Sequence, residues 1–145
     1  MFNIAVERVI NKPIKTVFAV LSDHANYAQF KGVDASTLLQ TGEYEVNGQG
    51  ALREIVAGKS VLHERIVGFK PPRYMAYKIE YSKPLPYDHE LGQLTLTEIT
   101  SGTHVRWESK GHINIPLIGG WYFDKQIEKF GARAFGSILK HIDMQ

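Results

Sequence analysis

Hydrophobic and polar positions along the chain repeat with two different periods, and the change of period separates expected strands from expected helices. Residues 2–10 alternate at every second position, which predicts a first strand. Behind Pro13, which suits the first turn of a helix, apolar positions follow helical spacing to about Ser22, and a second short helix is expected through Phe30. Residues 33–113 then contain almost only short alternating runs and turn residues, so this part predicts consecutive strands.

Turn residues fix the expected pairing of these strands. Gly58-Lys59 suits a two-residue hairpin turn, which sets Val56 opposite Val61 and Arg53 opposite Glu64. Four-residue loops at 70–73 and 100–103 complete two further hairpins and set these pairs: Ile66 with Tyr77, Glu64 with Ile79, Leu62 with Tyr81, Leu96 with Trp107, and Glu98 with Val105.

This pairing collects a mostly apolar set of side chains on one face of the sheet and leaves charged side chains on the other. The apolar face carries Arg53, Ile55, Leu62, Glu64, Ile66, Met75, Tyr77, Ile79, Tyr81, Leu94, Leu96, Val105 and Trp107. A sheet with one apolar face and one wet face needs a cover, so another element must pack on it.

The last apolar pattern, from about Ile118 to Ile142, has helical spacing and is long enough to be that cover. Its stripe consists of Phe123, Ile127, Phe130, Ala134, Ile138 and Ile142, with Phe135 and Leu139 beside it. Gly131 and Gly136 weaken a helix, and either close packing on the sheet or room for a ligand would explain them. The expected fold class is α+β: a curved antiparallel sheet of about seven strands wrapped around a long C-terminal helix, with two short helices after the first strand, as one domain over residues 1–145.

Composition narrows the classes of function. The chain has 43% hydrophobic and 22% charged residues, as is typical of a globular protein. Its net charge of +2 comes from scattered basic residues, which argues against nucleic-acid binding, and the absence of cysteine excludes disulfides and thiolate sites. No apolar stretch has the length of a membrane span and no signal-peptide pattern is present, so we expect no membrane insertion and a cytoplasmic location.

Candidate chemistry is sparse along this sequence. The six histidines form no metal-binding motif and no residue pattern indicates a cofactor, so neither a metal nor a cofactor is expected. Asp88-His89-Glu90 has the composition of a catalytic cluster. In a strand, however, His89 points away from both neighbours, which favours a solvated strand start.

One polar pair remains as a candidate site. Arg53 and Glu64 are predicted to meet on the apolar face of the sheet, near Tyr77 and Tyr81. Such a pair could orient a carbonyl or hydroxyl group of a ligand, and Glu64 could also transfer a proton. The alternatives are a structural ion pair at the rim of a cavity, or a slipped register that places both side chains outside.

Several short sequences occur in an order that is typical of one superfamily. Residues 10–23 lead from a strand through Lys-Pro into a helix, Gly48-Gln49-Gly50 precedes the strand of Arg53, residues 71–77 continue one hairpin, and residues 92–107 form the last one. The chain therefore resembles the helix-grip, START-like (Bet v 1-like) superfamily, and within it the polyketide cyclase/dehydrase branch. The resemblance covers nearly the whole chain. It implies the fold more strongly than the activity, because the superfamily includes lipid carriers, plant hormone receptors, polyketide cyclases and chaperone activators.

On this basis we expect the protein to bind a small hydrophobic or aromatic molecule between the sheet and the long helix, for transport or sensing. A first alternative is a cyclase or aromatase-type enzyme with Arg53, Glu64 and Tyr77 as candidate catalytic residues. A second is a protein-interaction or chaperone-activator module, which an exposed apolar patch outside the cavity would favour. The predicted cavity of a few hundred Å³ is lined by Arg53, Glu64, Met75, Tyr77, Ile79, Tyr81, Leu94, Leu96, Trp107, Phe123, Ile127 and Phe130.

Overall fold

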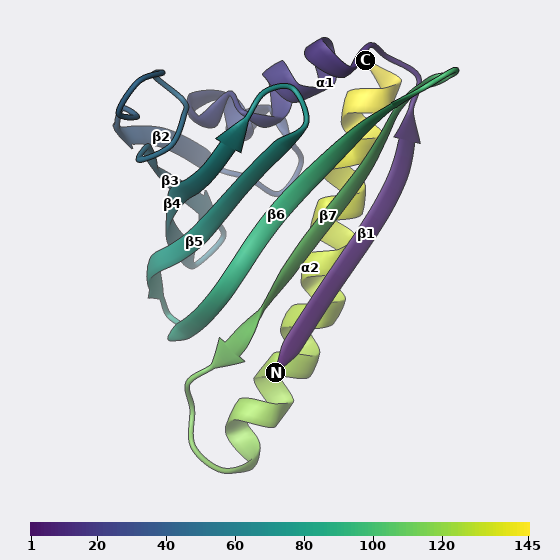
Figure 1. The fold of residues 1–145 in the computed structure, drawn as a ribbon. Helices are drawn as coiled ribbons and strands as arrows, with labels where there is room; N and C mark the ends of the chain where they lie inside the picture. The colour runs from purple at the N-terminus through teal and green to yellow at the C-terminus, as the bar shows by residue number, and fades with distance from the viewer.

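The computed structural model describes residues 1–145 and confirms the predicted fold class. The elements are β1 (Phe2–Ile10), α1 (Ile14–Leu21), the 3-10 helix η1 (His24–Gln29), β2 (Ala35–Gln40), β3 (Leu52–Ala57), β4 (Ser60–Lys70), β5 (Tyr74–Lys83), β6 (Tyr87–Ile99), β7 (Gly102–Ile113) and α2 (Ile118–Met144). The seven strands form one antiparallel sheet in the order β1-β7-β6-β5-β4-β3-β2. The sheet curves in front of α2, which runs along its β1 and β7 edge (Figure 1).

The hairpin of β3 and β4 has the predicted register. Ala57 pairs with Ser60 across a two-residue turn, and Arg53 lies opposite Glu64. Gly58 has a φ of 59°, a left-handed conformation that glycine adopts without a steric penalty, so the turn falls at this residue.

The hairpin of β4 and β5 differs from the predicted register at two positions, and the two differences offset each other. Its loop has three residues rather than four, because Lys70 pairs with Tyr74. One extra residue in β4, Val67, then shifts the register by one position. The shift restores two predicted pairs: Ile66 with Tyr77, and Glu64 with Ile79.

A second extra residue, Glu80 in β5, turns the following side chains to the other face of the sheet. Tyr81 therefore lies opposite His63 rather than Leu62. Its ring packs on the His63 ring with 4.9 Å between centroids, and 48% of Tyr81 is exposed. The prediction that Tyr81 faces the cavity is wrong, because a one-residue bulge exchanges the two faces of a strand.

The hairpin of β6 and β7 has a tighter turn than predicted. Only Thr100-Ser101 lie between the paired ends, so Leu94 is opposite Trp107 and Leu96 is opposite Val105. The predicted pairs of this hairpin were wrong by two residues. Because strand side chains repeat every two residues, each of these side chains still lies on the predicted face.

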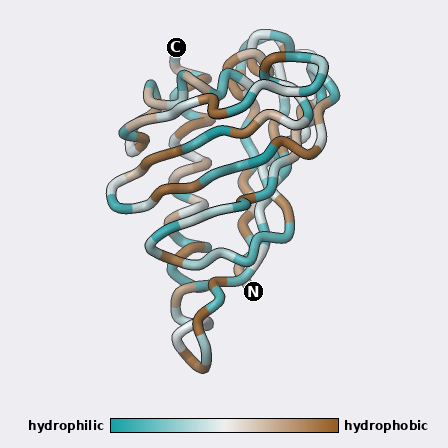
Figure 2. Tube along the Cα trace, turned by 90° about the vertical axis from the view of Figure 1, so that its left-hand side faces the viewer, coloured by the Kyte–Doolittle hydropathy of each residue, from teal (hydrophilic) through white to brown (hydrophobic).

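The main core fills one end of the space between sheet and helices. It contains apolar side chains of α1, of the sheet and of the last turns of α2, among them Ile10, Ile14, Val17, Leu21, Ile66, Met75, Leu94, Leu96, Val105, Trp107, Ile138, Leu139 and Ile142. Hydrophobic and hydrophilic stretches alternate along the strands, as a sheet with one covered face requires (Figure 2). A second, smaller cluster of Phe2, Ile4 and Ile113 lies near the N-terminal half of α2.

Two carboxylates attach α2 to the strands at its two ends. Asp124 accepts a hydrogen bond of 2.7 Å from the backbone N–H of Ile113. Asp143 accepts bonds of 3.0 and 2.8 Å from the guanidinium of Arg8 and one of 3.0 Å from the backbone N–H of Asn11. These contacts hold the whole length of the helix near one edge of the sheet.

Candidate functional site

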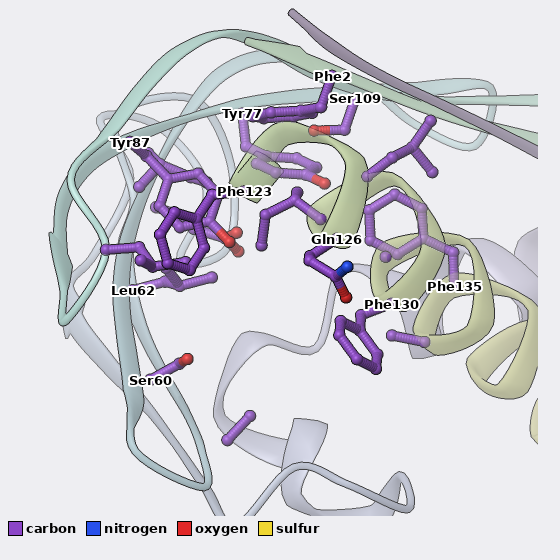
Figure 3. Close-up of a pocket in the computed structure, with 18 of the residues that line it drawn as sticks. Phe2, Ser60, Leu62, Tyr77, Tyr87, Ser109, Phe123, Gln126, Phe130 and Phe135 are labelled. Carbon is purple, nitrogen blue, oxygen red and sulfur yellow. The ribbon is translucent and has the colours of Figure 1, made fainter. Parts of the chain in front are cut away.

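A cavity of about 590 Å³ lies between the N-terminal half of α2 and the sheet. Its volume is within the usual range of small-molecule sites, as the sequence analysis predicted. The lining residues are Phe2, Ile4, Ala57, Ser60, Leu62, Glu64, Tyr77, Ile79, Leu85, Tyr87, Ser109, Tyr122, Phe123, Gln126, Ile127, Phe130, Gly131, Ala134 and Phe135. Side chains from α2 face those from the strands across this space (Figure 3).

The cavity exists because α2 covers the sheet unevenly. The helix lies along β1 and β7, whereas β3, β4 and β5 curve away from it (Figure 1). Phe123 and Ile127 are consequently only half-buried, and Phe130 is 55% exposed. A Cβ atom on Gly131 would lie 2.3 Å from Ile4 Cδ1, so this glycine serves close packing at the cavity floor.

The structure divides the predicted lining residues into two groups. Six of them line the cavity: Glu64, Tyr77, Ile79, Phe123, Ile127 and Phe130. Five are buried beneath it and do not reach it, which corrects the prediction for Arg53, Met75, Leu94, Leu96 and Trp107. These five share a face with the lining residues, but the C-terminal half of α2 and the short helices fill the space above them.

Arg53 forms the centre of a buried polar cluster. Its Nε donates to Glu64 Oε1 at 2.9 Å, and its Nη1 lies 3.1 Å from His24 Nδ1. The guanidinium lies 4.7 Å from the ring centroid of Tyr27 and 5.2 Å from that of Tyr77. With 1% exposure, Arg53 is not a handle for a ligand, and it holds the Glu64 carboxylate in position.

His24 is neutral, with a fixed tautomer. Its Nε2 lies 2.8 Å from the carbonyl oxygen of Asn47, which can only accept, so Nε2 carries the proton and Nδ1 accepts from Arg53. Burial, together with the Arg53 charge, lowers the pKa of His24 to about 3. A charged imidazole next to a buried guanidinium would be costly, and the neutral form avoids it.

Glu64 is the charged group that the cavity presents. It is 7% exposed and lines the cavity, and Arg53 occupies only its Oε1 atom. The other carboxylate oxygen, Oε2, accepts no hydrogen bond from the protein. The Glu64 side chain can therefore accept a hydrogen bond from a hydroxyl or amine group in the cavity.

A second polar cluster, which the sequence analysis missed, involves His89. This residue is 7% exposed, and its Nδ1 accepts a 3.0 Å bond from the backbone N–H of Ile79. Its Nε2 lies 2.8 Å from Ser109 Oγ, and its ring stacks on Tyr77 at 5.7 Å. Burial and, to a smaller extent, the charge of Lys78 lower the pKa of His89 to about 4.

The prediction of a solvated strand start at His89 is wrong because of a bulge. His89 pairs with Gly111 and Leu91 pairs with Lys110, so Glu90 is an extra residue in β6. The bulge places His89 on the covered face together with Leu94. Ser109 could have been recognised from the sequence, because it continues the alternation of Val105 and Trp107.

Tyr77 occupies the wall between the two polar clusters. Its hydroxyl accepts a 2.9 Å hydrogen bond from Trp107 Nε1, and its ring packs over Gly92, where a Cβ atom would lie 2.2 Å away. Burial raises the pKa of Tyr77, and the Glu64 carboxylate raises it further, so the phenol stays protonated.

The curved sheet, the short helices after β1 and the cavity beneath a long C-terminal helix define a protein of the helix-grip class. The family model for polyketide cyclase/dehydrase and lipid transport matches residues 1–143, and the chain belongs to this family. No curated protein sequence matches the chain. No helix combines the length and the apolar character that crossing a membrane requires.

Solved structures share this fold at low sequence identity. A START superfamily protein from Mycobacterium smegmatis has a TM-score of 0.77 and 7% identity, over 99% of this chain and 99% of that chain. The protein TTHA0849 from Thermus thermophilus has a TM-score of 0.79 and 18% identity, over 98% and 94%. The Zhui aromatase/cyclase from Streptomyces sp. R1128 has a TM-score of 0.75 and 14% identity, over 97% and 92%. Identities this low show a common fold alone.

Proposed function

We propose that residues 1–145 form one ligand-binding domain that holds a small hydrophobic or aromatic molecule in the cavity under α2, for transport or sensing in the cytoplasm. The observation that carries this proposal is the cavity of about 590 Å³, in which 14 of the 19 lining residues are hydrophobic. An apolar cavity of this size with a few polar groups is the usual form of a small-molecule site.

The polar group that would orient this ligand is Glu64. Its free Oε2 atom suits a hydroxyl or amine donor, while Arg53 holds the other oxygen from below. The ligand we propose is therefore largely apolar and carries at least one hydrogen-bond donor. Loss of that donor should weaken binding by about fivefold, the effect of about 1 kcal/mol from one net hydrogen bond.

A substitution that obstructs the cavity with a large side chain tests the proposal. Ala134 lines the cavity from an exposed position on α2, so Ala134→Trp should place a ring over it, whereas Arg133→Trp places the same ring on the neighbouring exposed position outside the lining. We expect the neutral fluorescent probe N-phenyl-1-naphthylamine to bind the wild type and the Arg133→Trp control, and to bind Ala134→Trp at least about tenfold more weakly. Absence of probe binding to the wild type would contradict the proposal.

A cyclase or aromatase activity is the second candidate. The family description and the Streptomyces aromatase/cyclase of the same fold favour it, and Glu64 and Tyr77 both line the cavity. Arg53 has no access to a ligand, so an orienting role for it would be indirect. Incubation with linear poly-β-ketone substrates would test this candidate: cyclised product that Glu64→Gln abolishes would support it.

An interaction module is the third candidate, and one exposed patch favours it. Outside the cavity lining, Leu117, Ile118 and Trp121 at the start of α2 are between 65% and 94% exposed. This apolar patch is bordered by Lys125, whose Nζ lies 5.7 Å from the centroid of the Trp121 ring, and the patch could pair with the same patch of a second copy of the chain. Sedimentation velocity tests the pairing: association that Trp121→Ser abolishes would support it, and a monomer at all concentrations would contradict it.

A further inference from the structure

Two buried hydroxyl groups on the cavity wall each accept one hydrogen bond from the core, and no protein group accepts their protons. Ser109 and Tyr77 both line the cavity, with exposures of 5% and 2%. Figure 3 shows their side chains on the same wall, next to Phe2. His89 connects them, since its ring stacks on Tyr77 and its Nε2 contacts Ser109 Oγ.

The direction of the hydrogen bond between His89 and Ser109 follows from the other ring nitrogen. A backbone N–H can only donate, so the bond from Ile79 N–H makes Nδ1 of His89 the unprotonated nitrogen. Nε2 of the neutral ring then carries the proton and donates to Ser109 Oγ over 2.8 Å. The Ser109 hydroxyl is an acceptor toward the core, and its own proton finds no acceptor in the protein.

This tautomer excludes one other role for the pair. A histidine that activates a serine nucleophile must take the serine proton on an unprotonated nitrogen, while the second nitrogen donates to a carboxylate or carbonyl group. In His89 the arrangement is reversed, because the nitrogen that faces Ser109 is protonated and the other accepts from Ile79. Ser109 is consequently a directed hydrogen-bond donor and not an activated nucleophile.

Tyr77 follows the same logic through a different ring. The indole Nε1–H of Trp107 can only donate, and it donates to the Tyr77 hydroxyl oxygen over 2.9 Å. No protein group accepts the phenolic proton of Tyr77. Two hydroxyl groups, each fixed by an N–H from the core, thus present donors to the cavity.

We infer that Ser109 and Tyr77 form a two-donor subsite that binds an acceptor oxygen, such as a ketone or other carbonyl group, on the cavity ligand. This inference rests on the proposed binding function and extends it. Glu64 would take a donor of the ligand, and the Ser109–Tyr77 subsite would take an acceptor. The ligand class is then an apolar or aromatic molecule with a carbonyl oxygen and a hydroxyl or amine group.

A matched pair of probes tests the subsite. 2-Acetylnaphthalene carries a ketone, and 2-isopropylnaphthalene has nearly the same shape without the oxygen. Their affinities can be measured by displacement of N-phenyl-1-naphthylamine. Ser109→Ala should weaken the ketone about fivefold, the loss expected for one hydrogen bond, and change the hydrocarbon by less than about twofold. Tyr77→Phe should act in the same direction.

Two further variants serve as controls. Ser101→Ala makes the same change in the exposed turn between β6 and β7 and should alter neither affinity. Ser109→Cys replaces the hydroxyl by a slightly larger group that is a weaker donor, so it should still lose affinity for the ketone if Ser109→Ala does not fold. Equal effects of Ser109→Ala on the two probes would overturn the subsite and leave the binding function intact. Failure of the wild type to bind any of the probes would overturn both.

The tautomer of His89 gives an independent readout. Long-range ¹H–¹⁵N correlation spectra distinguish a ring protonated at Nε2 from one protonated at Nδ1. The subsite requires the Nε2–H form at neutral pH, and a signal from His89 protonated at Nδ1 would overturn it, because Nε2 could then accept the Ser109 proton.

Discussion

The two halves of α2 carry similar apolar stripes, yet one half forms a solid core and the other covers a cavity. Near the C-terminus, Ile138, Leu139 and Ile142 are 7% exposed or less. Near the middle of the helix, Phe130 is 55% exposed, although it lies on the same predicted stripe. The difference comes from the neighbours: α1 and the adjoining strands fill the space beside the last turns, and no element does so beside the first turns. An apolar face thus requires cover, but its neighbours decide whether the cover is protein or ligand.

The two buried histidines show the same contrast between the packed core and the cavity. His24, in the packed core, has both ring nitrogens bonded to protein groups, namely the carbonyl oxygen of Asn47 and the Arg53 guanidinium. His89, beside the cavity, passes its hydrogen bond to Ser109, whose proton remains available. A complete polar network stabilises the fold, whereas a network that ends in an unused donor prepares a site.

The largest expected effect is at the Arg53–Glu64 ion pair, which lies between the packed core and the cavity. Arg53→Met should lower the free energy of unfolding by about 3–5 kcal/mol, because it leaves Glu64 and His24 without their buried donor. Adding Glu64→Leu should recover much of that loss. Urea unfolding of the single and double variants measures the coupling. A loss of about 1 kcal/mol or less in each single variant would contradict a buried pair.

The packed end of α2 should be sensitive to truncation. Leu139 is fully buried among core residues, so Leu139→Ala should lower the free energy of unfolding by about 2–5 kcal/mol through lost contacts and a new void. Urea unfolding measures the change. A loss below about 1 kcal/mol would mean that this end is as loosely packed as the cavity end.

Acid should destabilise the protein through the two buried histidines. Their folded-state pKa values, about 3 for His24 and about 4 for His89, lie below the ordinary value of 6.5, so the unfolded chain binds more protons between these limits. The contribution of these two histidines to the free energy of unfolding is therefore fully present above pH 6.5 and is lost as the pH falls. Between pH 7 and pH 5 each histidine should cost about 2 kcal/mol.

Gln variants separate the contributions of these histidines. His24→Gln and His89→Gln keep an amide donor and acceptor but cannot titrate, so each should flatten the pH dependence by about one proton. Urea midpoints across this pH range provide the measurement. An unchanged slope in either variant would show that its histidine is not neutral in the fold.

The smallest expected effect is at the cavity. Phe130→Ala should lower the free energy of unfolding by less than about 1 kcal/mol, in place of the 3–5 kcal/mol typical of a buried phenylalanine, because the side chain is already half in solvent. The same variant should weaken N-phenyl-1-naphthylamine binding, since Phe130 lines the cavity. A large loss of stability would mean that this half of the helix is core.

The sequence determined the fold class, the elements and the Arg53–Glu64 pair. Period-two and helical patterns are local properties, and Gly58 fixes a turn by its own backbone preference. An error of two residues at the β6–β7 turn did not matter, because it preserves the face of every side chain.

Only the tertiary structure decided which apolar residues line the cavity and which polar groups reach it. Single extra residues at Glu80 and Glu90 exchange the faces of Tyr81 and His89, and nothing in the local pattern announces them. The short helix η1 covers Arg53 with His24 and Tyr27, whereas the position of α2 along β1 and β7 leaves Glu64 at the cavity wall. Bulges and helix placement depend on contacts between distant segments, so a pattern read along one segment does not contain them.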